Sequence, residues 1–158
     1  MSLPVEQKAE LAIQALLQAD AILLAMLPGG ADSIRHTEDV EDLETTNITI
    51  SATGKPTPGL ELDGNRDLDV RVRICSLSLE ARDTSGNTVD VATIHNERIE
   101  RVREILQTDS IAADLSALQP DFTAQGFEML PESGASPVGR SMLGFCNFRL
   151  HACADADL

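Results

Sequence analysis

The N-terminal part of the sequence repeats apolar residues at the spacing of a helix. Apolar positions recur at intervals of three and four over 4–27, Pro4 suits a first helical turn, and the run Pro28-Gly29-Gly30 ends the pattern. The sequence therefore predicts one helix over 4–27. Because its last two turns are apolar nearly all round, we expect that end to be buried in the core or under another subunit.

Strict alternation replaces the helical spacing in the middle of the chain. The segment 47–53 alternates apolar and polar residues, and 68–82 does so more strongly, which predicts two strands. Between them, 54–67 contains three glycines and two prolines, so we expect a long flexible loop or a hairpin tip there. The carboxylate-rich segment 31–44, which precedes the first strand, is expected to be extended and solvated.

The apolar side of the longer strand changes part-way along it. Even-numbered positions are apolar from Leu68 to Ile74, but from Cys75 onward the apolar positions are odd-numbered. Such a change needs a β-bulge, or a strand that buries opposite faces against different neighbours. We therefore expect one half of this strand to pack in the chain's own core and the other half against a neighbouring molecule.

The C-terminal half of the chain returns to helices before it ends in strands. In order, the pattern predicts helices over 91–107 and 111–118, a strand over 122–130, a polar loop over 131–139 and a closing strand over 141–153. Together these elements predict an α+β fold, with the N-terminal helix and the helical pair packed on a mainly antiparallel β-sheet. We expect a single domain over 1–153 and a frayed acidic tail over 154–158.

Charge and composition narrow the function. The chain carries 12 basic and 26 acidic residues, a formal net charge of −14, and has four Phe but no Trp or Tyr. Phosphate backbones repel such a chain, so we expect no specific binding to DNA or RNA. Three cysteines without a CxxC spacing argue against a disulfide framework and favour a reducing cytoplasm. The apolar run 21–27 is too short to cross a bilayer, so no membrane association is expected.

Each chemical motif in the sequence lacks a required residue. Ser141 has no second glycine of a G-x-S-x-G elbow, and the alternating polar run 63–69 lacks the glycine and glutamate of a calcium loop. His151 and Cys153 share a strand face but supply only two zinc ligands. His95 lies on the apolar stripe of its helix, where we expect a hydrogen-bonded core or interface histidine. We therefore expect no catalytic residue, no metal and no cofactor.

The order of elements from Leu68 to Cys153 carries a family resemblance. It consists of the strand Leu-Asp-Val-Arg-Val-Arg-Ile at 68–74, an acidic polar turn at 81–84, the two helices, the strand beginning at Phe122, and Gly139-Arg140-Ser141-Met142 leading into the closing strand. This arrangement resembles the small tail-terminator or tail-completion proteins found in the neck of long-tailed bacteriophages and prophages.

The resemblance implies a non-enzymatic structural subunit of a virion tail or neck, assembled in the host cytoplasm. It implies a homo-oligomeric ring, usually a hexamer, that caps the tail tube and contacts the tube protein and the head-connector proteins. DNA would pass through the ring without specific binding, which an acidic lumen favours. Combined with the change of apolar side in the long strand, it predicts a subunit interface at Val70, Val72, Cys75, Leu77, Leu79, Phe145 and Phe148.

Three alternative functions remain open from the sequence. The chain could be a head–tail adaptor or a tail tube subunit, which belong to the same structural class. It could instead be a small cytoplasmic metal-dependent hydrolase that uses His36, Asp39 and His95. A further alternative is an acidic adaptor that binds a basic partner protein, which a strong salt dependence would reveal.

Overall fold

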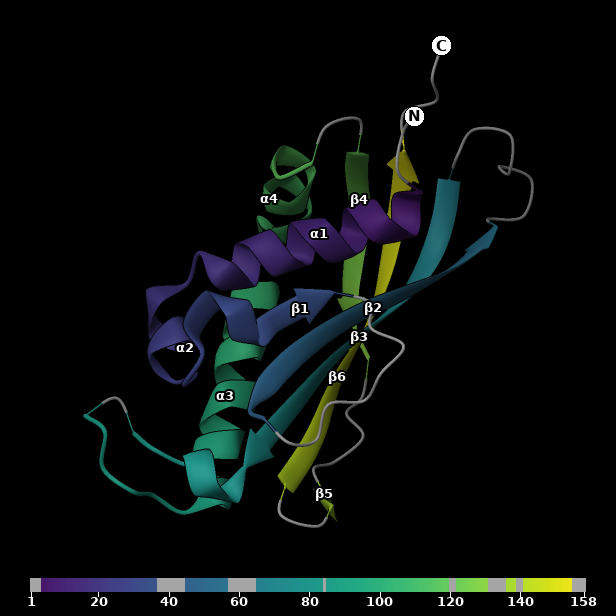
Figure 1. Ribbon diagram of the computed structural model, residues 1–158. Helices are drawn as coiled ribbons and strands as arrows, with labels where there is room; N and C mark the ends of the chain where they lie inside the picture. Colours follow the sequence, from purple (N-terminus) through teal and green to yellow (C-terminus); the bar gives the residue numbers. More distant parts are fainter. Residues whose placement is uncertain are drawn as a thin grey trace.

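The protein is represented by a computed structural model that describes residues 4–36, 45–56, 65–83, 85–119, 122–130, 136–138 and 141–154. Its main elements, in chain order, are α1 (Val5–Gln18), α2 (Ala21–Ala25), β1 (Ile34–His36), β2 (Asn47–Pro56), β3 (Asn65–Leu77), α3 (Val91–Leu106), α4 (Ile111–Ala117), β4 (Phe122–Met129), β5 (Ser136–Val138) and β6 (Ser141–Ala154) (Figure 1). Short 3-10 turns follow α2 and β3, at Gly30–Ser33 and Ser78–Glu80.

The strands form one curled sheet in the order β1-β2-β3-β6-β4, and β5 pairs with the start of β6 (Figure 1). β1 runs parallel to β2, whereas every other pairing is antiparallel. The predicted α+β fold with a mainly antiparallel sheet is therefore confirmed.

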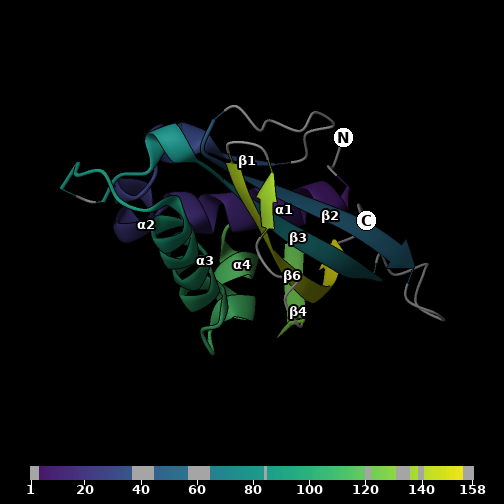
Figure 2. The ribbon, with the colours of Figure 1, turned by 90° about the horizontal axis from the view of Figure 1, so that it is seen from below.

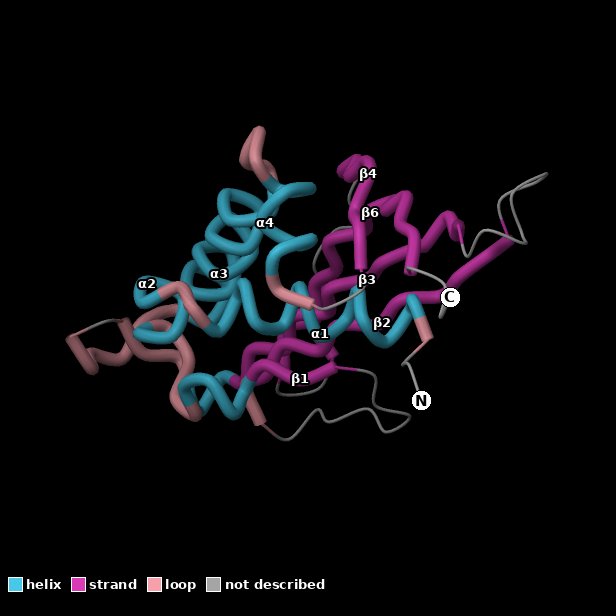
Figure 3. The backbone as a smooth tube through the Cα atoms, turned by 90° about the horizontal axis from the view of Figure 1, so that it is seen from above, coloured by secondary structure: helices cyan, strands magenta, loops and turns pink. Residues whose placement is uncertain are grey.

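The helices cover one side of this sheet. α1 crosses the strands, and α3 and α4 lie together against β3, β6 and β4 (Figures 2 and 3). Alternation places the even-numbered residues of β3, from Leu68 to Ile74, on the covered side, where all four apolar side chains are buried. They form one core with the apolar stripes of α1 and α3, as the 3.6-residue period predicts.

The predicted single helix over 4–27 is wrong, because the chain breaks between α1 and α2. Asp20 adopts an extended backbone conformation (φ −90°, ψ 108°), and its carboxylate accepts a hydrogen bond from the Leu23 N–H at 2.8 Å. Aspartate is a favoured N-cap because its side chain satisfies an amide that a helix start leaves unpaired. The apolar period continues through this point, but the cap redirects the chain.

The predicted strand over 68–82 is wrong at both ends. It begins earlier, at Asn65, and stops at Leu77, because a 3-10 turn follows and leaves the Leu79 side chain 70% exposed. Pairing with β6 is continuous from Asn65 to Leu77, so β3 contains no bulge. Instead, both faces of the strand are buried where the apolar side changes, at Ile74 and Cys75.

The bulge in this sheet lies in β4. Ala124 pairs with Ala152, and Gly126 pairs with His151, which is the next residue along β6. Gln125 is therefore an extra residue in β4 that has no partner in this register. After this shift Phe127 packs against Phe148, with ring centroids 4.7 Å apart. The bulge therefore brings both Ala124 and Phe127 to the helix-covered side, although they are three residues apart.

Several predicted loops are shorter than expected. The loop over 54–67 is wrong at both ends, because β2 continues to Pro56 and β3 begins at Asn65; positions 57–64 lie outside the described residues. β5 occupies part of the predicted polar loop over 131–139. Of the segment 31–44, the first residues form the 3-10 turn and β1, and 37–44 lie outside the description. Ala154 belongs to β6, and the remainder of the tail is not described.

Close contact between α3 and β6 depends on Gly144. A Cβ atom at this position would lie 2.7 Å from Ile99 Cδ1 and 2.8 Å from His95 Nε2, both in the packed core. We expect Gly144→Ala to lower the free energy of unfolding by about 2 kcal/mol through overpacking, as measured by urea denaturation.

Gly126 provides the matched control for Gly144. A Cβ added at Gly126 meets no atom within 4 Å. Gly126→Ala should therefore change stability by less than about 0.5 kcal/mol. Equal losses in the two variants would contradict the proposed close contact at Gly144.

Candidate subunit interface

The side of the sheet opposite the helices is the candidate site, and we call it the outer face. It is formed by the odd-numbered residues of β2, β3 and β6, which alternation turns away from the core. Register places Ser51, Arg71 and Asn147 in one row across the three strands, and Thr53 beside Asp69 in the next. These two rows are therefore polar, in contrast to the apolar covered side.

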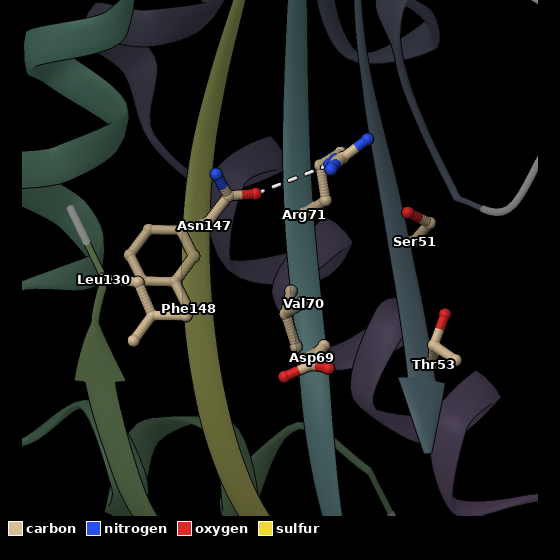
Figure 4. Close-up of a pocket in the computed structure, with 8 residues that line it drawn as sticks. All are labelled: Ser51, Thr53, Asp69, Val70, Arg71, Leu130, Asn147 and Phe148. Carbon is tan, nitrogen blue, oxygen red and sulfur yellow. Dashed lines mark hydrogen bonds between the residues drawn. The ribbon is translucent and has the colours of Figure 1, made fainter. Parts of the chain in front are cut away.

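Arg71 organises the open part of the outer face. Its guanidinium lies over the Phe145 ring, 4.8 Å from the centroid. Its Nε donates a hydrogen bond to Asn147 Oδ1 at 3.4 Å, which Figure 4 shows as a dashed line. Such a cation–π contact contributes about 0.5–1 kcal/mol at an exposed site. These two contacts hold the Arg71 guanidinium against Phe145 and Asn147, and the Arg71 side chain remains exposed on the outer face.

A shallow recess of about 590 Å³ lies beside Arg71. Its lining comes from three neighbouring strands and from the residue after β4, namely Ser51, Thr53, Asp69, Val70, Arg71, Leu130, Asn147 and Phe148 (Figure 4). Val70 and Phe148 are buried, and polar and apolar atoms share the accessible lining about equally. The recess is open and holds one carboxylate and one guanidinium, an arrangement better suited to a protein surface than to enclosed chemistry.

The other end of the outer face is closed within the chain. Arg73 is buried, and its guanidinium donates hydrogen bonds to Asn47 Oδ1 and Thr49 Oγ1, both at 3.3 Å. Cys75 and Leu143 are buried beside it. Among the described residues, the outer face is therefore open at the two rows around Arg71 and Asp69 and closed around Arg73 and Cys75.

The seven predicted interface residues divide into two groups. Val70, Val72, Cys75 and Phe148 are buried inside this chain, so their burial requires no neighbour. Leu77 and Phe145 are half-buried, and Leu79 is the most exposed large apolar residue among those described. The interface prediction now depends on Leu77, Leu79 and Phe145.

Each of the three histidines has its own partner among the described residues. His95 is fully buried, and its Nδ1 lies 2.7 Å from Ser76 Oγ, which confirms the predicted hydrogen-bonded histidine. Burial, together with the charge of Arg98, lowers the pKa of His95 from 6.5 to about 4. An imidazole that solvent cannot reach cannot act on a substrate.

The remaining histidines have separate partners. The Nδ1 atom of His36 lies 3.8 Å from a Glu10 carboxylate oxygen, and His151 pairs with Asp67 at 2.6 Å. Asp39, the third residue of the hydrolase alternative, lies outside the described residues. Across the described ranges, no three His, Cys, Asp or Glu side chains are grouped to hold a metal ion.

Two arginines of α3 form contacts that our sequence analysis missed. Arg98 is fully buried, and its Nε and Nη2 donate to the Met26 carbonyl at 3.0 and 2.7 Å. Arg101 binds both carboxylate oxygens of Asp20, at 2.9 and 2.6 Å. One signal was available, because Arg98 is three residues after His95 and therefore on the same apolar stripe.

Comparison with known proteins gives a match in fold. No protein family model matches this sequence, and no curated protein sequence matches it. A chain from the solved structure of the virion of a native gene transfer agent particle has a similar fold, with a TM-score of 0.60 and 13% sequence identity. The match covers 91% of this chain and 93% of that chain. The two chains therefore share an architecture over nearly their whole length.

None of the described helices combines the length and the apolar character that crossing a bilayer requires.

Proposed function

We propose that this chain is a structural protein of a phage-like virion, and more specifically a ring-forming tail-terminator subunit. The observation that carries the proposal is the fold match to a chain of the gene transfer agent virion, which spans almost all of both chains. The element order that resembles tail terminators supports the same conclusion from the sequence. In this role the ring would cap the tail tube and join it to the head connector.

The surface of the chain is compatible with ring closure. A ring needs two different surfaces on each subunit, because each contact is heterologous. One of them is proposed to include Leu79 at the end of β3 and Phe145 on the outer face. Leu79 is 70% exposed, so its apolar side chain is available for contact with a partner. The net charge of −14 favours a lumen through which DNA slides without binding.

Solution mass and electron microscopy test this proposal. We expect the purified chain to form annular particles of one size in negative stain, with a mass of several subunits by light scattering. Filaments in place of single rings would favour the tail tube alternative. A chain that stays monomeric at high concentration, shows no rings and turns over a small molecule would overturn the proposal.

A substitution at Leu79 tests the interface. Leu79→Asp should abolish the ring and leave a folded monomer, because a charge would be forced into an apolar contact. Leu118→Asp is the matched control, since Leu118 is also exposed but lies after α4. Light scattering and circular dichroism report assembly and folding separately. A ring that survives Leu79→Asp intact would refute this interface.

A further inference from the structure

Side chains of α3 bind both ends of the short helix α2. It has five residues, which is too short for a stable isolated helix. Arg101 binds the Asp20 carboxylate at its start, and Arg98 binds the Met26 carbonyl at its end. The Arg101 contact also lowers the pKa of Asp20, so the carboxylate stays charged. Two arginines one turn apart on α3 therefore clamp both ends of α2.

The clamped helix presents an apolar side chain outward. Ile22 is 55% exposed, although its neighbour Leu23 is fully buried in the core. Beside it lies an open groove of about 650 Å³ between α2 and α3, lined by Ile22, Met26, Thr93, Asn96, Glu97, Glu100, Arg101 and Glu104. A rigid exposed isoleucine beside a groove is a preorganised anchor point, because little entropy is lost when a partner covers it.

Carboxylates border the α3 side of this groove. Glu97, Glu100 and Glu104 follow each other at intervals of three and four, so they share one face of the helix. Glu100 pairs with Arg103 and Glu104 with Arg101, yet their side chains remain 63% and 64% exposed. The one cation that lines the groove, Arg101, is already engaged by Asp20. The groove therefore presents negative charge around an apolar floor.

We propose that the α2–α3 groove binds a basic segment of a different protein, with an apolar side chain covering Ile22 and Lys or Arg side chains facing the three glutamates. Charge complementarity selects this occupant. A second copy of this chain offers few basic side chains to face these glutamates, because it has only 12 Lys and Arg against 26 Asp and Glu. The proposal does not depend on ring formation, since the groove lies on the helical side and the proposed ring contact involves the outer face.

A designed peptide pair tests the groove directly. The probe is a fluorescein-labelled twelve-residue amphipathic helix built from lysine and leucine, compared with a version that has serine in place of leucine. We expect the first to bind and the second to bind much more weakly in fluorescence anisotropy, because the anchor is apolar. Ile22→Ser should weaken binding of the first peptide by about tenfold, as loss of a central apolar contact does.

Charge and position are tested by further variants. The double substitution Glu97→Gln and Glu100→Gln should weaken binding and reduce its dependence on salt, whereas Leu118→Ser should change neither. All variants alter exposed side chains, and thermal melts confirm that they fold. Equal affinity for the leucine and serine peptides, or no effect of Ile22→Ser, would mean that binding comes from general charge attraction alone. Either result would overturn the proposal. A change in oligomeric mass on Ile22→Ser would also overturn it, because the occupant would then be another copy.

Discussion

Arg98→Ala is expected to lower the free energy of unfolding by about 3 kcal/mol, because a buried carbonyl would lose both of its charged donors and the core would lose a large side chain. Arg98 is fully buried, and desolvation lowers its pKa to about 10, so it remains protonated at neutral pH. Its charge therefore strengthens the hydrogen bonds that it donates to the Met26 carbonyl. Urea denaturation would measure the loss.

Arg103→Ala is the control for Arg98→Ala. It removes the same type of residue from the same helix, but Arg103 pairs with Glu100 at the surface, where such a pair contributes less than about 1 kcal/mol. The rate of backbone amide hydrogen exchange should also rise across 21–27 in Arg98→Ala, and it should stay unchanged in Arg103→Ala. If both substitutions lowered the free energy of unfolding equally, the buried contact between Arg98 and Met26 would have no special role in holding α2.

Acidification from pH 7 to pH 4 is expected to cost up to about 3 kcal/mol of stability through His95 alone. The folded protein lowers the pKa of this imidazole from 6.5 to about 4 by burial and by the nearby charge of Arg98. Above pH 6.5 the imidazole is neutral in both states. As the pH falls through 6.5 the unfolded chain gains a proton that the folded chain cannot accept, and below pH 4 the loss levels off.

Comparison with His95→Gln isolates this contribution. Carboxylates titrate in both proteins, so their effects cancel when the pH dependence of the variant is subtracted from that of the wild type. We expect the wild type to lose more stability than His95→Gln between pH 7 and pH 4, measured by urea denaturation at each pH. Parallel curves would show that His95 is not protonated on unfolding, contrary to its buried contact with Ser76.

The sequence predicted the type of nearly every large element because the core itself is periodic. The apolar spacing did not predict the boundaries of two elements. Asp20 caps a new helix inside an apolar run, and the alternation that continues to Leu79 conceals the end of β3 at Leu77. In both places the apolar spacing is the same as in an unbroken element, so spacing alone could not locate the boundary.

The predicted interface residues depend on a pattern that has two possible causes. An apolar face indicates burial, but it does not indicate whether the chain's own helices or another molecule provide the cover. Val72 and Phe148 are covered from within the chain, whereas Leu79 is not. The pairing of Arg71 with Phe145 also depends on the register between β3 and β6, which connects residues far apart in the sequence.

The extra residue in β4 makes this strand the place where the chain can change length most easily. Gln125 stands outside the regular pairing with β6, so Ala124 and Phe127 both point toward the helices although they are three residues apart. A chain without Gln125 would form an ordinary ladder and would keep both side chains on the same side. Loss of one residue in β3, by contrast, would turn half of its core residues toward water. Deletions and insertions are therefore best accommodated at the α4 side of the sheet, away from its central strands.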